Sequence, residues 1–400
     1  MSFLEKLKKK NAGLSAYSRY AGEYVYPKLE GPLRSRMRFK GKEVIVWSFN
    51  DYLGLQSDPR IIDYEVEIVK KFGAGYPAGS RLLTGNTDYH EELEYEISKL
   101  VGKETLLLNF GYQGIMSVVD SLVDRNDTIL YDQLVHASLI DGVRLHQGPK
   151  SSFRHNDINH LRKHLSNASK REGEILVLVD GVFSMRGDTA RVEEILKLKE
   201  EYDFALLVDD AHGFMTFGEH GSVGELMDGV DIYISTFAKS LAIIGGFVSA
   251  RKEFIEYFKY NLRSQTFGRT LPVVDVASVL FKLKLLKEEG EERRKKLWNN
   301  TQYLQDRLKG IGYDIGNTCS PITPIYLECG EDIAAEFINE LRNRYGIFCS
   351  VVVYPVIPKE LMILRLIVTA LHSERDIEET ITAFSILDKK YNINQPVLQD

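Results

Sequence analysis

Residues 204–213 have the sequence FALLVDDAHG, in which an apolar run ends on Asp209, Asp210 and, two positions later, His212. The run shows no alternation of polar and apolar side chains, which indicates a strand buried on both faces. The two carboxylates therefore emerge at the carboxyl end of that strand. A buried acid in such a place needs a cationic partner or a hydrogen bond, because otherwise its pKa rises sharply.

Similar apolar runs recur on both sides of this segment, with helical patterns between them. The runs are TLLLNF (105–110), TILYD (128–132), EILVLVDGVF (174–183), DIYISTF (231–237) and GGFVSA (245–250). Strands that alternate with helices predict an α/β fold, with a mostly parallel central sheet between helices. In such a sheet the ligand binds at the carboxyl ends of the strands.

The limits of this alternation predict the domain boundaries. We expect an N-terminal arm over residues 1–47, which has no sustained apolar period, and a large domain over residues 48–288. A charged helical stretch over 284–300 would connect the large domain to a small α+β domain, residues 289–400. Two lobes would suit a site in the cleft between them.

Composition and charge exclude several classes of protein. The 400 residues carry a net charge of −6, which argues against an electrostatic nucleic-acid binder. No apolar run reaches the roughly 18–20 residues that a transmembrane helix needs. The first residues, MSFLEKLKKKNAG, lack the apolar core of a signal peptide, so we expect a cytoplasmic protein. Neither the three cysteines nor His160 and His164 form a convincing metal site, and we expect none.

Two further segments place reactive side chains just after strands. Lys239 follows DIYISTF between Thr236 and Ser240, and His136 opens the segment HASLIDG (136–142) after TILYD. Lys239 is either a solvated loop residue or a desolvated amine whose lowered pKa makes it nucleophilic. Taken singly, these residues and Asp209 all have ordinary structural interpretations.

Taken together, His136, Asp209 and Lys239, separated by 73 and 30 residues, resemble one kind of active site. The chain resembles the α-oxoamine synthases, which are pyridoxal-phosphate enzymes of fold type I, the aspartate-aminotransferase fold. These enzymes join an amino acid to an acyl thioester and release CO₂. The motifs that carry the resemblance are SFNDYLGL (48–55), GSRLLTGN (79–86), HEELE (90–94), NFGYQG (109–114), HASLIDG (136–142), DGVFSMRGD (180–188), VDDAHG (208–213), STFAKS (235–240) and RLIVTALH (365–372).

Within this family the chain most resembles the bacterial serine palmitoyltransferases, through NLRSQTFGRTLP (261–272), KLWNNTQYLQ (296–305), IGNTCSPITPIY (315–326) and VVVYPVIP (351–358). That branch condenses L-serine with a long-chain acyl thioester, on CoA or an acyl-carrier protein, in the first step of sphingolipid synthesis. The alternatives are 8-amino-7-oxononanoate synthase, glycine C-acetyltransferase, cysteate acyltransferase and a non-catalytic partner subunit. The presence of Lys239 argues against the last of these.

The resemblance also implies roles for individual residues. Lys239 would hold the cofactor as a Schiff base and move the Cα proton, and Asp209 would contact the pyridine nitrogen. Around them, the implied contacts are His136 on the ring face and the substrate, His212 and Ser184 beside the ring, Gly111, Tyr112, Thr236 and Ser240 around the phosphate, Thr270 on the phosphate of the neighbouring subunit of a homodimer, Asn50 in the substrate pocket, and Arg365 on the amino acid's carboxylate.

A few positions depart from the family pattern. Arg186 stands where members usually carry an acid, and Gly268 and Arg269 stand where small or hydroxyl residues are frequent. These changes remove no catalytic group, but they leave the identity of the acyl chain open. Arg186 and Arg269 could contact the phosphate of an acyl carrier or form surface ion pairs, and we favour ion pairs.

Overall fold

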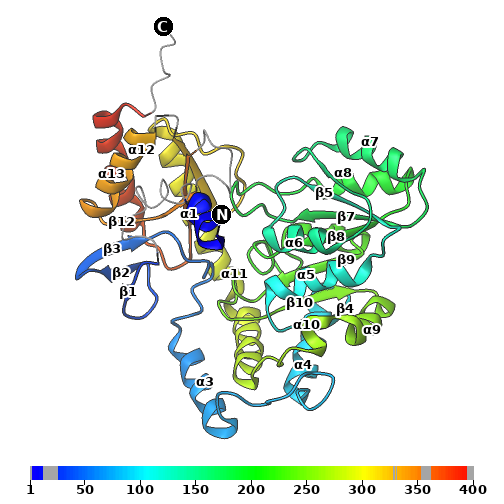
Figure 1. Cartoon of the computed structure of the whole chain (residues 1–400). Helices are drawn as coiled ribbons and strands as arrows, with labels where there is room; N and C mark the ends of the chain where they lie inside the picture. Colours follow the sequence, from blue (N-terminus) through cyan, green and yellow to red (C-terminus); the bar gives the residue numbers. More distant parts are fainter. Residues whose placement is uncertain (1, 12–25, 328, 330, 353–361, 394–400) are drawn as a thin grey trace. The chain divides into compact units, whose positions relative to one another are not determined.

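The computed structural model describes residues 2–11, 26–327, 329, 331–352 and 362–393. The chain divides into two compact units, one made of residues 50–295 and the other of residues 1–49 together with 296–400 (Figure 1). Residues 1 and 12–25 of the expected arm and most of the VVVYPVIP segment lie outside the described residues. The division into an arm, a large domain and a small domain stays a prediction.

A seven-stranded sheet forms the centre of the unit 50–295, with the strand order β4-β10-β9-β8-β7-β5-β6. The strands are β4 (Glu104–Leu108), β5 (Thr128–Asp132), β6 (Lys150–Phe153), β7 (Ile175–Asp180), β8 (Ala205–Asp209), β9 (Ile232–Thr236) and β10 (Gly246–Ala250). From β6 to β9 all neighbours are parallel, whereas β10 is antiparallel to both β4 and β9. The expected α/β fold with a mostly parallel sheet is confirmed.

Helices cover this sheet and bury the apolar side chains of its strands (Figure 1). Alternate residues of one strand, such as Leu176 and Leu178, belong to the same core cluster as Val118, Leu139 and Phe258 from three of the helices. The helical elements are α3 (Pro59–Phe72), α4 (Asp88–Val101), α5 (Gly111–Leu122), α6 (Ala137–Leu145), α7 (Ile158–Ala168), α8 (Val192–Lys197), η2 (Leu198–Glu200), η3 (Gly221–Gly229), α9 (Lys252–Asn261) and α10 (Arg263–Thr266).

The other unit contains two smaller sheets, of strand orders β1-β2-β3-β12 and β11-β14-β13. Its elements are α1 (Phe3–Asn11), β1 (Leu29–Glu30), β2 (Arg36–Phe39), β3 (Lys42–Val46), β11 (Ile322–Leu327), α12 (Glu331–Asn343), β12 (Ile347–Phe348), β13 (Ser350–Val352), β14 (Met362–Ile367) and α13 (Glu374–Tyr391). The indole of Trp47 stacks on His372, with ring centroids 3.9 Å apart, and donates to Thr380 Oγ1 at 3.1 Å. Residues distant in the sequence thus build one core in this unit.

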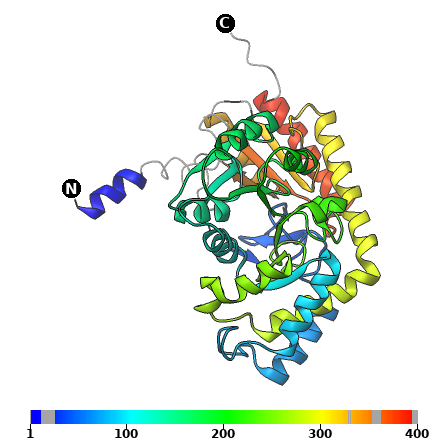
Figure 2. The same cartoon turned by 90° about the vertical axis from the view of Figure 1, so that its right-hand side faces the viewer.

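Helix α11 (Val273–Gly310) runs without a break for 38 residues and is drawn in green-yellow to yellow in Figure 2. Its residues up to 295 are grouped with the seven-stranded sheet, and those from 296 with the other unit. The predicted helix over 284–300 is therefore confirmed as part of a longer helix. Among the described residues, none of the helices combines the length and the apolar character that crossing a bilayer requires.

Candidate active site

A cavity of about 280 Å³ opens where three central strands end. Asp180, Asp209 and Thr236 are the last residues of β7, β8 and β9, and all three line it. Every lining residue belongs to the unit 50–295. The sequence-predicted residues that the fold brings together here are Gly111, Tyr112, His136, Ser184, Asp209, His212, Thr236 and Lys239.

Lys239 lies in the loop that joins β9 to the antiparallel β10. Hydrogen bonds close this loop: Phe237 N–H donates to Gly245 O at 3.0 Å, and Ala242 N–H donates to Lys239 O at 3.0 Å. Gly245 has a φ of +110°, a conformation that glycine adopts without strain. The loop therefore presents the half-buried Lys239 side chain to the cavity from a fixed backbone.

The Lys239 loop is also held from helix α11. Lys282 is 1% exposed, and its ammonium donates to Leu241 O at 2.9 Å. Burial lowers the pKa of Lys282, while Glu65, Asp51 and Asp275 act in the opposite direction. A buried cation thus caps a carbonyl two residues after Lys239, which further restricts the loop.

Two buried carboxylates meet at the floor of the cavity. Asp209 and Asp180 are 3% and 4% exposed, and their Cα atoms are partners in the β7–β8 register. Burial raises the pKa of Asp209 to about 7, although an N–H from Ala211 and the charge of Lys239 act against this rise. Burial and the neighbouring Asp209 also raise the pKa of Asp180. Because no ion pair joins either acid to a cation within the described part of the chain, this floor suits a positively charged ligand atom.

His136 stands at the rim of the cavity and caps helix α6. Its Nδ1 accepts the backbone N–H of Ser138 at 3.3 Å, and its own backbone N–H donates to Asp180 Oδ1 at 3.1 Å. The ring is exposed and meets Tyr112 edge-on, with centroids 5.9 Å apart. Partial desolvation and the charge of Lys239 lower the pKa of His136, which favours a neutral imidazole that can lie over an aromatic ring.

The amino-terminal end of α5 forms another wall. Gly111 and Tyr112 are its first residues, and the first N–H groups of a helix have no partners within the helix. A Cβ at Gly111 would lie 2.9 Å from Thr236 Oγ1, so only glycine allows this approach. Thr236 itself donates to Gly245 O at 2.8 Å. This end of the cavity suits an anion such as a phosphate.

His212 is held by Tyr52, which the sequence motifs do not predict as a site residue. Tyr52 is fully buried, and its hydroxyl lies 2.7 Å from His212 Nδ1. Tyr52 comes from the SFNDYLGL segment, which precedes His212 by about 160 residues. The segment 50–58 therefore determines how one wall of the cavity is oriented.

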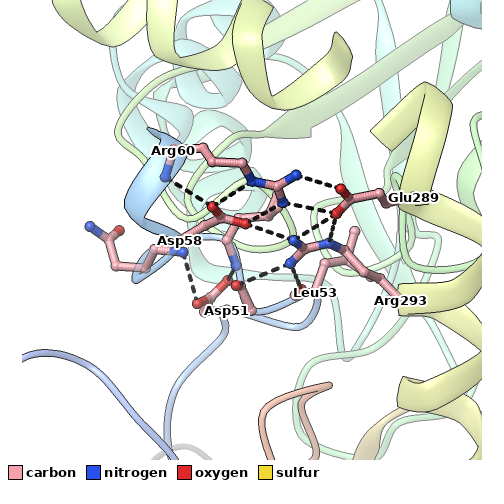
Figure 3. A network of polar contacts seen from close by, with 9 residues as sticks. Asp51, Leu53, Asp58, Arg60, Glu289 and Arg293 are labelled. Atoms are coloured by element: carbon pink, nitrogen blue, oxygen red, sulfur yellow. Dashed lines mark hydrogen bonds and ion pairs between the residues drawn. The ribbon is translucent and has the colours of Figure 1, made fainter. Parts of the chain in front are cut away.

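A network of ion pairs and hydrogen bonds fixes this segment to helix α11 (Figure 3). Arg293 donates to Leu53 O at 3.1 Å and to Asp58 Oδ2 at 2.7 Å, and Arg60 joins Asp58 to Glu289. Arg60 and Arg293 hold the pKa of Asp58 at about 2. The adjacent Asp51 accepts the N–H groups of Leu55 and Gln56, and Figure 3 shows it beside the same network.

The other predicted site residues lie outside the cavity. The hydroxyl of Ser240 is buried without a hydrogen-bond partner among the described residues, as is Asn50 Oδ1. Thr270 Oγ1 lies 3.1 Å from His90 Nε2, and burial lowers the pKa of His90 to about 4. Arg365 is on β14, in the other unit. The roles of these four residues stay predictions.

The two arginines that depart from the family pattern contact nearby protein groups. Arg186 Nε lies 3.5 Å from Asp188 Oδ2, in keeping with the favoured surface ion pair. Arg269 donates to the carbonyl of Gly75. On α7, His160 and His164 bring their Nε2 atoms to 3.2 Å, but the described residues hold no cluster of three metal-ligating side chains.

Sequence reasoning missed Asp180 and Tyr52 as parts of the site. Asp180 carried a usable signal, because it ends the apolar run ILVLVD as Asp209 ends ALLVD. Tyr52 carried none, since its contact with His212 depends on tertiary packing.

Comparison with known proteins gives the family. The family model for class I and II aminotransferases matches residues 42–384. A cysteate-C-fatty acyltransferase of Capnocytophaga ochracea is 48% identical over 378 residues, which cover 92% of this chain and 90% of that protein. A serine palmitoyltransferase of Sphingobacterium spiritivorum is 38% identical over 385 residues, covering 95% and 93%. A solved structure of SPT with pyridoxal phosphate has a TM-score of 0.90 at 27% identity, covering 98% of this chain and all of that one.

The cofactor of the chain is pyridoxal phosphate, and the cavity fits it. The buried carboxylate of Asp209 matches a protonated ring nitrogen, and the amine of Lys239 matches the aldehyde. The first turn of α5 matches the phosphate. The chain therefore belongs to the class I and II aminotransferases, and within them to the α-oxoamine synthases, pyridoxal-phosphate-dependent C-acyltransferases.

Proposed function

We propose that this enzyme condenses L-cysteate with a long-chain fatty acyl thioester, releasing CO₂ and the thiol. The observation that carries the choice of amino acid is the 48% identity to the Capnocytophaga cysteate-C-fatty acyltransferase, against 38% to the Sphingobacterium serine palmitoyltransferase. The sequence motifs predict L-serine as the amino acid, with cysteate acylation as an alternative. Because the identity to the cysteate enzyme is higher than that to the serine enzyme, we prefer L-cysteate.

The residues of the cavity supply the steps that a protein must perform. Pyridoxal phosphate, when bound, withdraws the electron pair left at the amino acid's Cα. Lys239 Nζ takes the Cα proton and returns one after CO₂ has left. The Asp209 carboxylate keeps the ring nitrogen protonated, and His136 covers the ring and orients the substrate. The acyl group is delivered by CoA or an acyl-carrier protein.

A second candidate is the same condensation with L-serine. It is supported by the relatedness to serine palmitoyltransferases over nearly the whole chain. L-Serine carries a hydroxyl where cysteate carries a sulfonate, so the two substrates differ in charge and size at one position only.

An amino-acid screen separates these candidates. The holoenzyme is mixed with L-cysteate, L-serine, L-alanine or glycine, each with palmitoyl-CoA, and the cofactor's absorbance and the aminoketone are measured. We expect kcat/KM for cysteate to exceed that for serine by at least about tenfold, since a site that pairs a charged group rejects analogues lacking it. A preference for serine would establish the second candidate, and activity with alanine or glycine alone would reject both. Reactions without thioester are the control.

We also propose that the enzyme is a homodimer in which Thr270 serves the neighbouring subunit's phosphate site. Thr270 does not line the cavity of its own chain. Mixed dimers of a Lys239→Ala chain and a Thr270→Ala chain should then contain one site with both substitutions and one with neither. We expect partial recovery of activity on mixing, measured after unfolding and refolding the two chains together. If the mixture is no more active than its parents, Thr270 acts within its own subunit.

A further inference from the structure

A histidine behind the cavity wall connects two parts of the site. His155 does not line the cavity, and its side chain is 11% exposed. Its Nδ1 lies 3.1 Å from both carboxylate oxygens of Asp132, and its Nε2 lies 2.9 Å from Asp188 Oδ2. The imidazole thus bridges the end of β5 and the DGVFSMRGD segment.

This geometry favours one protonation state of His155, although the amide of Asn156 also lies 3.5 Å from its Nε2. A neutral imidazole carries one N–H, whereas both nitrogens here face carboxylates, which accept hydrogen bonds but do not donate them. Both contacts are hydrogen bonds only if the ring is an imidazolium. Burial lowers the pKa of His155, but Asp132 and Asp188 outweigh this effect and raise the pKa to about 9.

On one side, the bridge holds the turn that leads to His136. Asp132 is 1% exposed, and its Oδ1 also accepts the N–H of Leu134 at 2.9 Å. The N–H of Val135 donates to Asp132 O at 3.2 Å. His136 is the next residue, so the Asp132 carboxylate orients the backbone from which the His136 side chain departs.

On the other side, the bridge holds the loop that carries Ser184. The N–H of Phe183 donates to Asp188 O at 2.9 Å, and the N–H of Gly187 donates to Phe183 O at 2.8 Å, so Ser184 lies inside a closed loop. The Phe183 ring meets the His155 ring edge-on, with ring centroids 4.4 Å apart. Arg186 Nε also lies 3.5 Å from Asp188 Oδ2.

We propose that His155, as an imidazolium, is a positioning residue that fixes His136 and Ser184 relative to each other across the cavity. A parallel, uncharged connection runs through Asn156, whose N–H donates to Asp132 Oδ2 at 2.9 Å and whose side chain donates to Thr189 O at 3.0 Å. This second connection keeps the two segments attached when His155 is replaced. Loss of His155 should therefore loosen the site without unfolding the protein.

The protonation state is tested on the wild-type holoenzyme. Nitrogen-15 NMR of histidine-labelled protein, assigned with a His155→Gln variant, should show both His155 nitrogens protonated at about pH 7.5. A His155 ring with one unprotonated nitrogen at that pH would overturn the proposal, whatever the kinetics of the variant.

The positioning role is tested kinetically with a matched control. We expect His155→Gln to lower kcat about tenfold while changing the amino acid's KM by less than about threefold, because the reacting groups are misplaced and the pocket remains. The control His164→Gln, on α7, should leave both constants unchanged. Asp188→Asn should give the same kcat loss, and adding His155→Gln to it should cost little more. A wild-type kcat in His155→Gln, or fully additive losses, would contradict the proposal.

Discussion

Replacing Lys239 by alanine is expected to lower kcat by more than about a thousandfold, the largest effect of any single substitution in the chain. Lys239 is the amine that the β9–β10 loop presents to the cavity, and it lies beside the buried Asp209. A water molecule in the variant could not replace the Lys239 amine, because this amine both binds the cofactor and carries the Cα proton. Borohydride reduction of the wild-type holoenzyme, followed by peptide mass spectrometry, should place the cofactor on Lys239.

A second lysine provides the control for this experiment. Lys252 is exposed on α9 and forms an i, i+4 ion pair with Glu256. Lys252→Ala should keep wild-type activity and the same labelled peptide. Label on another lysine in the wild-type protein, or activity in Lys239→Ala within about tenfold of wild type, would show that a different residue holds the cofactor.

The strands of the central sheet were predictable because most of them are buried on both faces. Runs such as ALLVD and ILVLVD have no polar face, and the structure places them at the middle of the sheet. Strand β6 was not predicted, because its sequence KSSF lies at the edge of the sheet and carries polar side chains. The antiparallel direction of β10 was also not predictable, since the residue pattern of a buried strand does not indicate the direction in which the strand runs.

The positions of Asp209 and Lys239 in the cavity were predictable for the same reason, whereas the residues that support the site were not. Polar residues that follow buried strands must lie at one edge of a parallel sheet, which brought Asp209 and Lys239 together. The contact of Tyr52 with His212 and the bridge made by His155 join segments that are distant in sequence. Nothing in the local pattern of either segment indicates its partner.

The second large effect is expected for Asp209→Asn, which lowers the activity of the holoenzyme and changes how the stability of the cofactor-free protein depends on pH. In the holoenzyme, the loss of the carboxylate leaves the ring nitrogen without its anionic partner, and we expect kcat to fall by about a hundredfold or more. In the protein without cofactor, the same buried carboxyl destabilises the folded state when it is ionised. Burial raises its pKa from the ordinary value of 3.8 to about 7.

The sign of the pH dependence follows from that shift. Because folded Asp209 binds its proton more tightly than the unfolded chain does, this carboxyl favours folding at low pH, and that contribution declines as the pH rises from about 4 to about 7. Asparagine cannot ionise, so the variant escapes the decline. The Tm of Asp209→Asn minus that of the wild type, both without cofactor, should therefore be more positive at about pH 8 than at about pH 5.

The neighbouring Asp210 is a control for the sign of the change in Tm, because burial raises the pKa of Asp210 as well, although hydrogen bonds from Ser222 and Tyr233 act against that rise. It is fully buried but accepts hydrogen bonds from Ser222 and Tyr233, at 2.5 Å from the Ser222 hydroxyl and 2.9 Å from the Tyr233 hydroxyl, and it does not line the cavity. Asp210→Asn should lower the Tm at both pH values, because it disturbs a satisfied hydrogen-bond network. A Tm difference for Asp209→Asn that did not change between the two pH values would mean that Asp209 is ionised in the cofactor-free protein at both. The Asp209 carboxylate would then not need the positive charge of the cofactor in order to be ionised.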